Sequence, residues 1–161
     1  MFHKILILFI AFAIVHTNAH STLEIEGEGK LILEGIEIPE VEELVAATAA
    51  STLGKAGKAV VQYLKEMASA KSLSISQPYE GAVFMSSLDG TWGIWNGMVI
   101  GWYYHPTYSH QVSTIGKLGS KHSVASGGNW AVSAQTKGLY GNKVQYKTFM
   151  PNYNETHIIE Y

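Results

Sequence analysis

The sequence predicts a mainly β protein, in which a C-terminal antiparallel β-sandwich follows short strands and a kinked amphipathic helix, so that the chain is α+β overall. Three observations lead to this prediction. Between residues 82 and 149, short apolar runs recur at near-regular spacing with glycine-bearing turns between them, a pattern typical of sandwiches. Asn96-Gly97 separates two of these runs, and this dipeptide favours a hairpin. Residues 39–71 instead repeat apolar residues at helical spacing.

Residues 1–19 have the features of a secretory signal peptide. Lys4 precedes an apolar run from Ile5 to Val15, and Thr17 and Ala19 are small residues placed for cleavage after Ala19. A membrane-spanning helix would need ~20 apolar residues, so we expect a secreted, extracellular protein. The chain has no cysteine. An exported domain of this kind must therefore hold itself together by packing or by a partner, without disulfides.

The charges are unevenly distributed along the chain, although the net charge is only −2. Residues 20–38 form an acidic segment in which Leu and Ile alternate with Glu, and this period of two predicts short strands. Their acidic face could be a solvated surface, a mask for a basic part of the protein, or part of a cleaved pro-segment. The basic part is the stretch from Lys117 to Lys147, which holds five lysines and no acidic residue.

Residues 39–71 form the predicted amphipathic helical region. Pro39 suits the first helical position, and the glutamates that follow it suit the positive end of the helix dipole. The apolar stripe shifts around the helix near Gly54 and Gly57, so we expect a kink or turn there. The later lysines lie away from the apolar stripe. This half could lie on an anionic membrane, but packing against the protein core is favoured.

The remaining boundaries follow from local composition. Residues 72–81 are rich in Ser, Pro and Gly and are predicted to be a linker. Residues 82–149 are predicted to form the sandwich. Residues 150–161 are predicted to be a tail, which contains an N-glycosylation sequon that begins at Asn154. We expect residues 82–149 to fold without the N-terminal part. Trp130, Val132 and Ala134 share one face of their strand and are predicted to point inward.

Several functional classes are disfavoured by what the sequence lacks. There is no arginine, which disfavours nucleic-acid binding because arginine makes the usual bidentate contacts. His105, His110 and His122 do not follow a known metal-ligand spacing, so structural or surface histidines are the better interpretation. No catalytic motif is found, and no paired carboxylates are suitably placed. We therefore expect no enzyme, no metal and no cofactor.

A binding surface remains, and the stretch Ser126–Phe149 points to it. In this stretch lysines are interleaved with aromatic residues, and glycine-bearing turns separate two alternating runs. This pattern predicts a β-hairpin that carries both lysines and aromatic side chains. Lysine suits phosphate, and aromatic rings suit sugar faces or the membrane interface. The alternative is a solvated face with scattered aromatics. The candidate ligand-binding residues are Lys143, Lys147 and Phe149, which share one strand face, together with Tyr146, Trp92 and Tyr104.

Short motifs in the same order resemble the lactococcin 972 family of bacteriocins. They are Gly90-Thr91-Trp92, Tyr103-Tyr104-His105, the strand Ser109–Ser113, the run Gly128–Ala134, and Tyr146–Phe149. The resemblance covers about residues 88–150. It implies a secreted two-sheet antiparallel sandwich that binds the cell-wall precursor lipid II and interferes with septum formation. Members of that family have the sandwich soon after the signal, whereas here about 60 residues intervene.

Three functional hypotheses follow. The first is a bacteriocin-like antibacterial protein whose partner is a phosphorylated bacterial cell-wall lipid precursor. The second is a pore-forming toxin in which the 39–71 helix inserts into a membrane surface while the aromatic-rich sandwich docks. The third is a secreted glycan-binding module without toxicity.

Overall fold

The computed structural model describes residues 25–26, 30–51, 73–89 and 97–160, together with residues 64 and 66. Within this part of the chain the protein is mainly β, with antiparallel sheets and a short helix, which confirms the predicted class. The predicted signal peptide, the kink at Gly54 and Gly57, and Trp92 lie outside the described residues. No helix among the described residues is long and apolar enough to cross a membrane.

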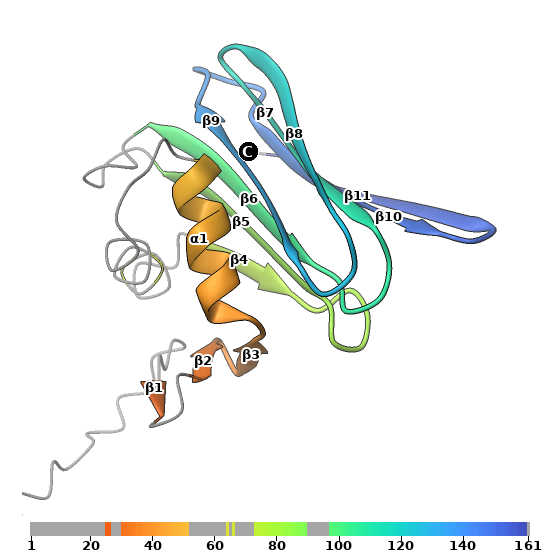
Figure 1. Ribbon diagram of the computed structural model, residues 1–161. Coiled ribbons are helices and arrows are strands. Elements are labelled where there is room, and N and C mark those ends of the chain that lie inside the picture. Colours follow the sequence, from red (N-terminus) through yellow and green to blue (C-terminus); the bar gives the residue numbers. More distant parts are fainter. Residues whose placement is uncertain are drawn as a thin grey trace, which may run out of the picture.

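Two four-stranded antiparallel sheets face each other (Figure 1). The first sheet has the order β4-β5-β6-β9, formed by β4 (Leu73–Ser76), β5 (Val83–Asp89), β6 (Met98–Tyr104) and β9 (Trp130–Thr136). The second has the order β11-β10-β7-β8, formed by β11 (Tyr153–Glu160), β10 (Lys143–Met150), β7 (His110–Gly116) and β8 (Gly119–Ala125). This arrangement is the β-sandwich that the regular spacing of short strands predicted.

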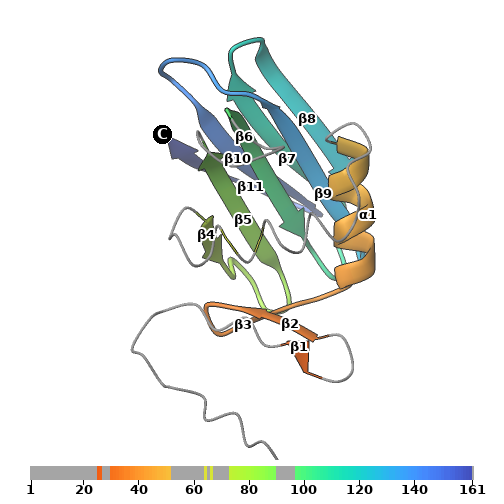
Figure 2. The ribbon, with the colours of Figure 1, turned by 90° about the vertical axis from the view of Figure 1, so that its left-hand side faces the viewer.

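A third layer covers the outer face of the first sheet. Helix α1 (Val41–Ser51) lies along this face beside β9, and a small sheet of β1 (Ile25–Glu26), β2 (Lys30–Leu33) and β3 (Ile36–Ile38) lies at the foot of the helix (Figure 2). Glu40 has a φ of 48°, and its carbonyl accepts the first helical hydrogen bond, from the N–H of Leu44. The helix therefore begins after Glu40, and the prediction that Pro39 is its first residue was wrong.

The first sheet is buried on both faces because its alternating side chains enter two different cores. One core lies between the two sheets and contains Ala82, Phe84, Val99, Tyr103, Val112, Ala131, Val144 and Tyr146. The other lies under α1 and the small sheet and includes Leu31, Leu33, Leu44, Leu64, Met85, Ile100, Trp102, Tyr104, Trp130 and Val132. Trp130, Val132 and Ala134 thus point inward as predicted, but toward the helix layer rather than the second sheet.

Gly101 in β6 shows how closely the two sheets approach. A Cβ atom placed on Gly101 would lie 2.4 Å from a methyl group of Val144 and 2.8 Å from one of Val112, both in the second sheet. Such distances are far inside van der Waals contact, so any side chain here would force the sheets apart. The absence of a side chain in a central strand therefore has a packing reason.

Two predicted boundaries were wrong because strand pairing extends beyond the local sequence signals. Part of the predicted linker 72–81 is strand β4, in which Leu73 pairs with Ser87 at the edge of the first sheet. Most of the predicted tail 150–161 is strand β11. It pairs with β10 along its whole length, from the pair of Met150 with Tyr153 to the pair of Lys143 with Glu160. Both segments satisfy backbone groups of a neighbouring strand, a gain that composition alone does not reveal.

The predicted hairpin over Ser126–Phe149 was also wrong. Its two strands exist as β9 and β10, but β9 pairs with β6 in the first sheet and β10 pairs with β7 and β11 in the second. The chain therefore crosses from one sheet to the other through residues 137–142. This crossing separates the two halves of the lysine- and aromatic-rich stretch.

Candidate functional site

The outward side chains of β10 form the centre of the candidate site. Val144, Tyr146 and Thr148 of this strand are buried, whereas Lys143, Gln145, Lys147 and Phe149 are partly or well exposed on the opposite side. This is the period-two alternation of a strand with one covered face. The prediction that Lys143, Lys147 and Phe149 share a face is confirmed.

The neighbouring strands widen this surface. By register, Lys147 lies between Gln111 of β7 and Thr156 of β11, while Gln145 lies between Ser113 of β7 and Ile158 of β11. The Gln111 amide donates a hydrogen bond to the Ser113 hydroxyl at 2.9 Å. We name this surface the lysine–aromatic face; its residues are Gln111, Gln145, Lys147, Phe149, Thr156 and Ile158, and the buried Ser113 supports the Gln111 amide from beneath.

The two lysines of β10 differ in their availability. The Lys143 ammonium forms an ion pair with Glu160, with an Nζ–Oε1 distance of 2.5 Å. The Lys147 ammonium lies 5.3 Å from the centroid of the Phe149 ring and has no carboxylate partner among the described side chains. Such a cation–π contact holds a cation without neutralising it. Lys147 is therefore the cation of this face that can still meet an anion.

Two other predicted site residues lie away from this face. Tyr146 is 4 % exposed and packs against Phe84 and Tyr103 in the core between the sheets. Burial raises the pKa of Tyr146. Tyr104 lies in the first sheet under the helix layer, where its ring packs on that of Trp130. Neither tyrosine can touch a ligand on the lysine–aromatic face, so their assignment to the site was wrong.

Tyr103 and Thr148 show how the polar side chains of the core are satisfied. Their hydroxyl groups share a hydrogen bond of 2.6 Å between the two sheets. Burial raises the pKa of Tyr103 to about 12, so the phenol stays protonated and inert at neutral pH. This pair joins β6 to β10 at the position next to Lys147.

Of the three histidines, His105 and His110 lie close together, with ring centroids 6.3 Å apart, and His122 is not part of this pair. His105 Nδ1 accepts hydrogen bonds from the backbone N–H groups of Thr107 and Tyr108, which places the ring proton on Nε2. The ring nitrogens of His110 face the carbonyls of Tyr108 and Asn129. Both rings are buried and hold loops, whereas His122 lies exposed on β8. Burial lowers the pKa of both His105 and His110.

The sequence did not reveal the contributions of β7 and β11 to the face. Gln111 and Ser113 carry no charge or aromatic ring that would single them out, and Thr156 lay in the presumed tail. Register alone brings Gln111 and Thr156 beside Lys147 and Ser113 beside Gln145. Comparison of the chain with family models finds no match, and comparison with curated proteins and with solved structures finds none either.

Proposed function

We propose that this protein is a secreted, non-enzymatic, bacteriocin-like antibacterial protein. On this proposal the lysine–aromatic face binds the phosphorylated glycan head group of a cell-wall precursor lipid such as lipid II and thereby blocks wall and septum synthesis. The supporting observation is the pairing of Lys147, which has no carboxylate partner among the described side chains, with Phe149 on an open sheet face.

The chemistry of this face matches such a head group. An ammonium group can bind a phosphate oxygen, and an exposed ring can cover the apolar face of a sugar. The amides of Gln111 and Gln145 and the hydroxyl of Thr156 offer donors and acceptors for sugar hydroxyl groups. The motif resemblance to lactococcin 972 supports the same class of target.

The pore-forming alternative receives less support from helix α1. Leu44 and Thr48 of this helix are fully buried against the first sheet, and Glu43 accepts a hydrogen bond from the backbone N–H of Trp130. Insertion of α1 into a membrane would have to break these contacts and expose the core beneath. A secreted glycan-binding module without toxicity uses the same face and differs only in its biological effect.

The proposal is tested with phosphatidylcholine vesicles that contain or lack lipid II. We expect the secreted protein, without the predicted signal peptide, to bind only the vesicles with lipid II. Lys147→Gln should weaken binding by about tenfold or more, since charged hydrogen bonds contribute roughly 1.5–3 kcal/mol. Lys143→Gln is the matched control, because Glu160 already neutralises this lysine; its effect should be small. The residual binding of Lys147→Gln should depend less on salt.

Three further experimental results distinguish the proposed function from the non-toxic glycan-binding module and the pore-forming toxin. Equal binding with and without lipid II, or full binding by Lys147→Gln, contradicts the proposed site. Binding to lipid II without growth inhibition of dividing Gram-positive cells supports the non-toxic module. Dye release from vesicles lacking lipid II supports the pore-forming toxin.

A further inference from the structure

One end of the sandwich exposes apolar side chains on two neighbouring loops. The β7–β8 turn carries Leu118, and the loop that crosses between the sheets carries Leu139 and Tyr140; both loops lie at the top of the molecule in Figures 1 and 2. Leu139 is fully exposed, Tyr140 is 88 % exposed and Leu118 is 81 % exposed. The other large apolar side chains exposed among the described residues are at most 58 % exposed. We name this region the loop end.

The crossing loop is held in place from within. Asn142 is buried; its side-chain carbonyl accepts the N–H of Gly138 at 2.7 Å, and its amide donates to the carbonyl of Gly138 at 3.0 Å. Gly141 has a φ of 72°, which favours glycine and turns the chain between Tyr140 and Asn142. The loop is therefore a defined turn that presents its apolar residues outward.

Backbone hydrogen bonds tie the loop end to the sheets beneath it. The N–H of Lys117 donates to the carbonyl of Thr136 at 3.0 Å, and the N–H of Lys137 donates to the carbonyl of Gly97 at 2.7 Å. A Cβ atom on Gly116 would lie 2.4 Å from that same Thr136 oxygen. The two loops thus touch through their backbones, and their outward side chains have a fixed spacing.

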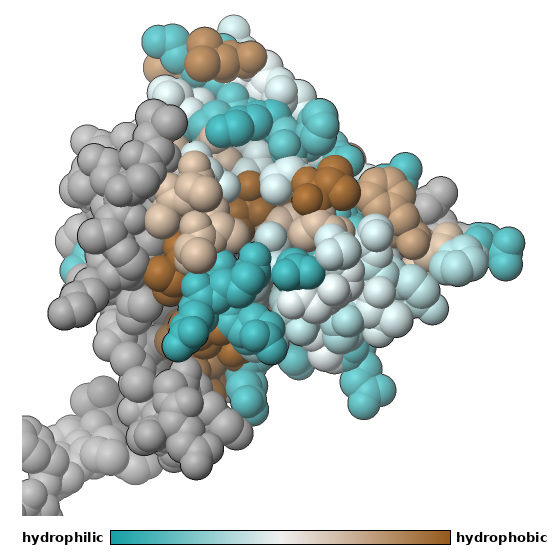
Figure 3. All heavy atoms as spheres, viewed as in Figure 1, coloured by the Kyte–Doolittle hydropathy of each residue, from teal (hydrophilic) through white to brown (hydrophobic). Residues whose placement is uncertain are grey.

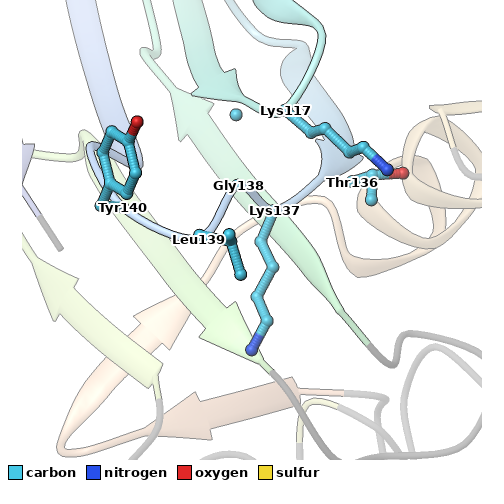
Figure 4. Close-up of a pocket in the computed structure, with 7 residues that line it drawn as sticks. Lys117, Thr136, Lys137, Gly138, Leu139 and Tyr140 are labelled. Atoms are coloured by element: carbon cyan, nitrogen blue, oxygen red, sulfur yellow. The ribbon is translucent and has the colours of Figure 1, made fainter.

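A pocket of about 630 Å³ opens between the two loops. It is lined by Gly116, Lys117, Thr136, Lys137, Gly138, Leu139 and Tyr140. Figure 4 shows Lys117 and Thr136 on one side, Tyr140 on the other, and Lys137 and Leu139 extending from the loop between them. The lining of the pocket therefore combines the two ammonium groups of Lys117 and Lys137 and the hydroxyl groups of Thr136 and Tyr140 with the apolar side chain of Leu139.

The charge around this end is positive. No acidic residue occurs between residues 97 and 150. By register, the acidic positions that reach this end among the described strands are Asp89, which pairs with Met98, and Glu160, which already pairs with Lys143. In Figure 3 the top of the molecule shows a brown apolar patch bordered by teal polar residues. Exposed apolar residues bordered by lysines complement an anionic membrane surface.

We propose that the loop end docks on a bilayer that contains anionic phospholipids. Leu118, Leu139 and Tyr140 enter the interfacial region, where leucine loses contact with water and a tyrosine ring keeps its hydroxyl hydrated. Lys117 and Lys137 bind lipid phosphate groups at the pocket, and each lysine near a negative membrane surface adds attraction that salt screens. The proposal concerns a site separate from the lysine–aromatic face.

Docking in this orientation has a consequence for that face. Lys143 begins β10 at the loop end, and Lys147 lies four residues farther along the strand, or about 13 Å at ~3.3 Å per residue. With the loop end in the bilayer surface, Lys147 stands at the height of a head group that projects from the membrane. The loop end then serves as an anchor that is independent of head-group recognition.

The test uses the protein as secreted, without the predicted signal peptide, and vesicles without lipid II, so that its outcome does not depend on the proposed function. We expect flotation with vesicles of phosphatidylcholine and phosphatidylglycerol, little flotation with phosphatidylcholine alone, and release at high salt. Leu139→Ser should weaken binding by about tenfold, since burial of one leucine side chain contributes roughly that factor or more. Lys117→Gln with Lys137→Gln should remove most of the preference for anionic lipid.

Val124→Ser is the matched control, because Val124 is an exposed apolar residue on β8, away from the loop end. It should bind like the unchanged protein. Lys117, Val124 and Leu139 are exposed and Lys137 is partly exposed, so circular dichroism should show the fold intact. No binding to anionic vesicles, equal binding to neutral vesicles, or equal losses for Leu139→Ser and Val124→Ser would overturn the proposal. Stable self-association or capture of a protein partner that depends on Leu139, without vesicle binding, would overturn it as well.

Discussion

The contact between Thr48 of α1 and Trp102 of β6 tests how the helix layer is held on the sandwich. Thr48 is fully buried; its hydroxyl donates to the Leu44 carbonyl at 2.6 Å and accepts the indole N–H of Trp102 at 3.0 Å. Thr48→Val keeps the shape of the side chain but removes the hydroxyl. The Leu44 carbonyl retains its helical hydrogen bond, whereas the indole N–H loses this acceptor inside the core.

The expected cost follows from that indole group. A buried donor left without an acceptor costs roughly 1–3 kcal/mol, a substantial part of the ~5–15 kcal/mol by which small domains are stable. We therefore expect Thr48→Val to lower the free energy of unfolding by about 1–3 kcal/mol. Thr48→Ser keeps the hydroxyl and should lose less, about the contribution of one buried methyl group.

The assay is equilibrium unfolding in urea, followed by circular dichroism, with the slope of the transition checked for constancy. The same substitution is then made in a Trp102→Phe background, where no indole N–H remains to be orphaned. There Thr48→Val should cost much less, because the coupling between the two residues is gone. An unchanged free energy of unfolding, or an equal loss in both backgrounds, would refute the docking of α1 on the sheet through this pair.

Other outcomes follow from the same two cores. Trp130→Ala should destabilise the fold by roughly 3–5 kcal/mol in urea unfolding, as expected for a buried tryptophan; the residue is 3 % exposed, and its indole N–H donates to the Pro39 carbonyl. A melting temperature that stays constant would place Trp130 on the surface instead. The lowered pKa values of His105 and His110 mean that the unfolded chain binds more protons, so stability should be constant above about pH 6.5 and fall as the pH drops below it. His105→Asn keeps an acceptor for the loop N–H groups and should flatten this acid dependence; a slope equal to that of the unchanged protein would contradict the assignment. A chain starting at Gln77 loses β4 and the layer over the first sheet, so we expect poor chemical-shift dispersion and aggregation; a well-dispersed spectrum would show that the sandwich folds alone.

The prediction for the chain that starts at Gln77 differs from the sequence-based expectation that residues 82–149 fold without the N-terminal part. The stretch 72–81 resembles a linker, and a self-contained set of strands follows it. The structure places large apolar side chains such as Met85 and Trp102 on the face of the first sheet that the N-terminal layer covers. Truncation would expose this face to water, at a cost that grows with the apolar area exposed.

The sequence by itself determined that the protein is mainly β and how side chains alternate within individual strands. Strand β10 could be assigned to one covered and one open face because Val144 and Tyr146 alternate with Lys143 and Lys147, and this period depends only on local backbone geometry. The class of fold followed for the same reason, since short alternating runs between turns have few other solutions. The shared face of Lys143, Lys147 and Phe149 was predictable on these grounds.

Only the tertiary structure decided which strands are neighbours. Alternation shows that a segment is a strand, but any strand edge offers the same row of N–H and C=O groups to a partner. The chain therefore gave no sign that β9 and β10 enter different sheets or that β11 completes the candidate face. Because β9 and β10 pair in different sheets, residues 137–142 cross between the sheets at the loop end. Long-range strand pairing is therefore the reason that Leu139 and Tyr140 are among the most exposed apolar residues of the described chain.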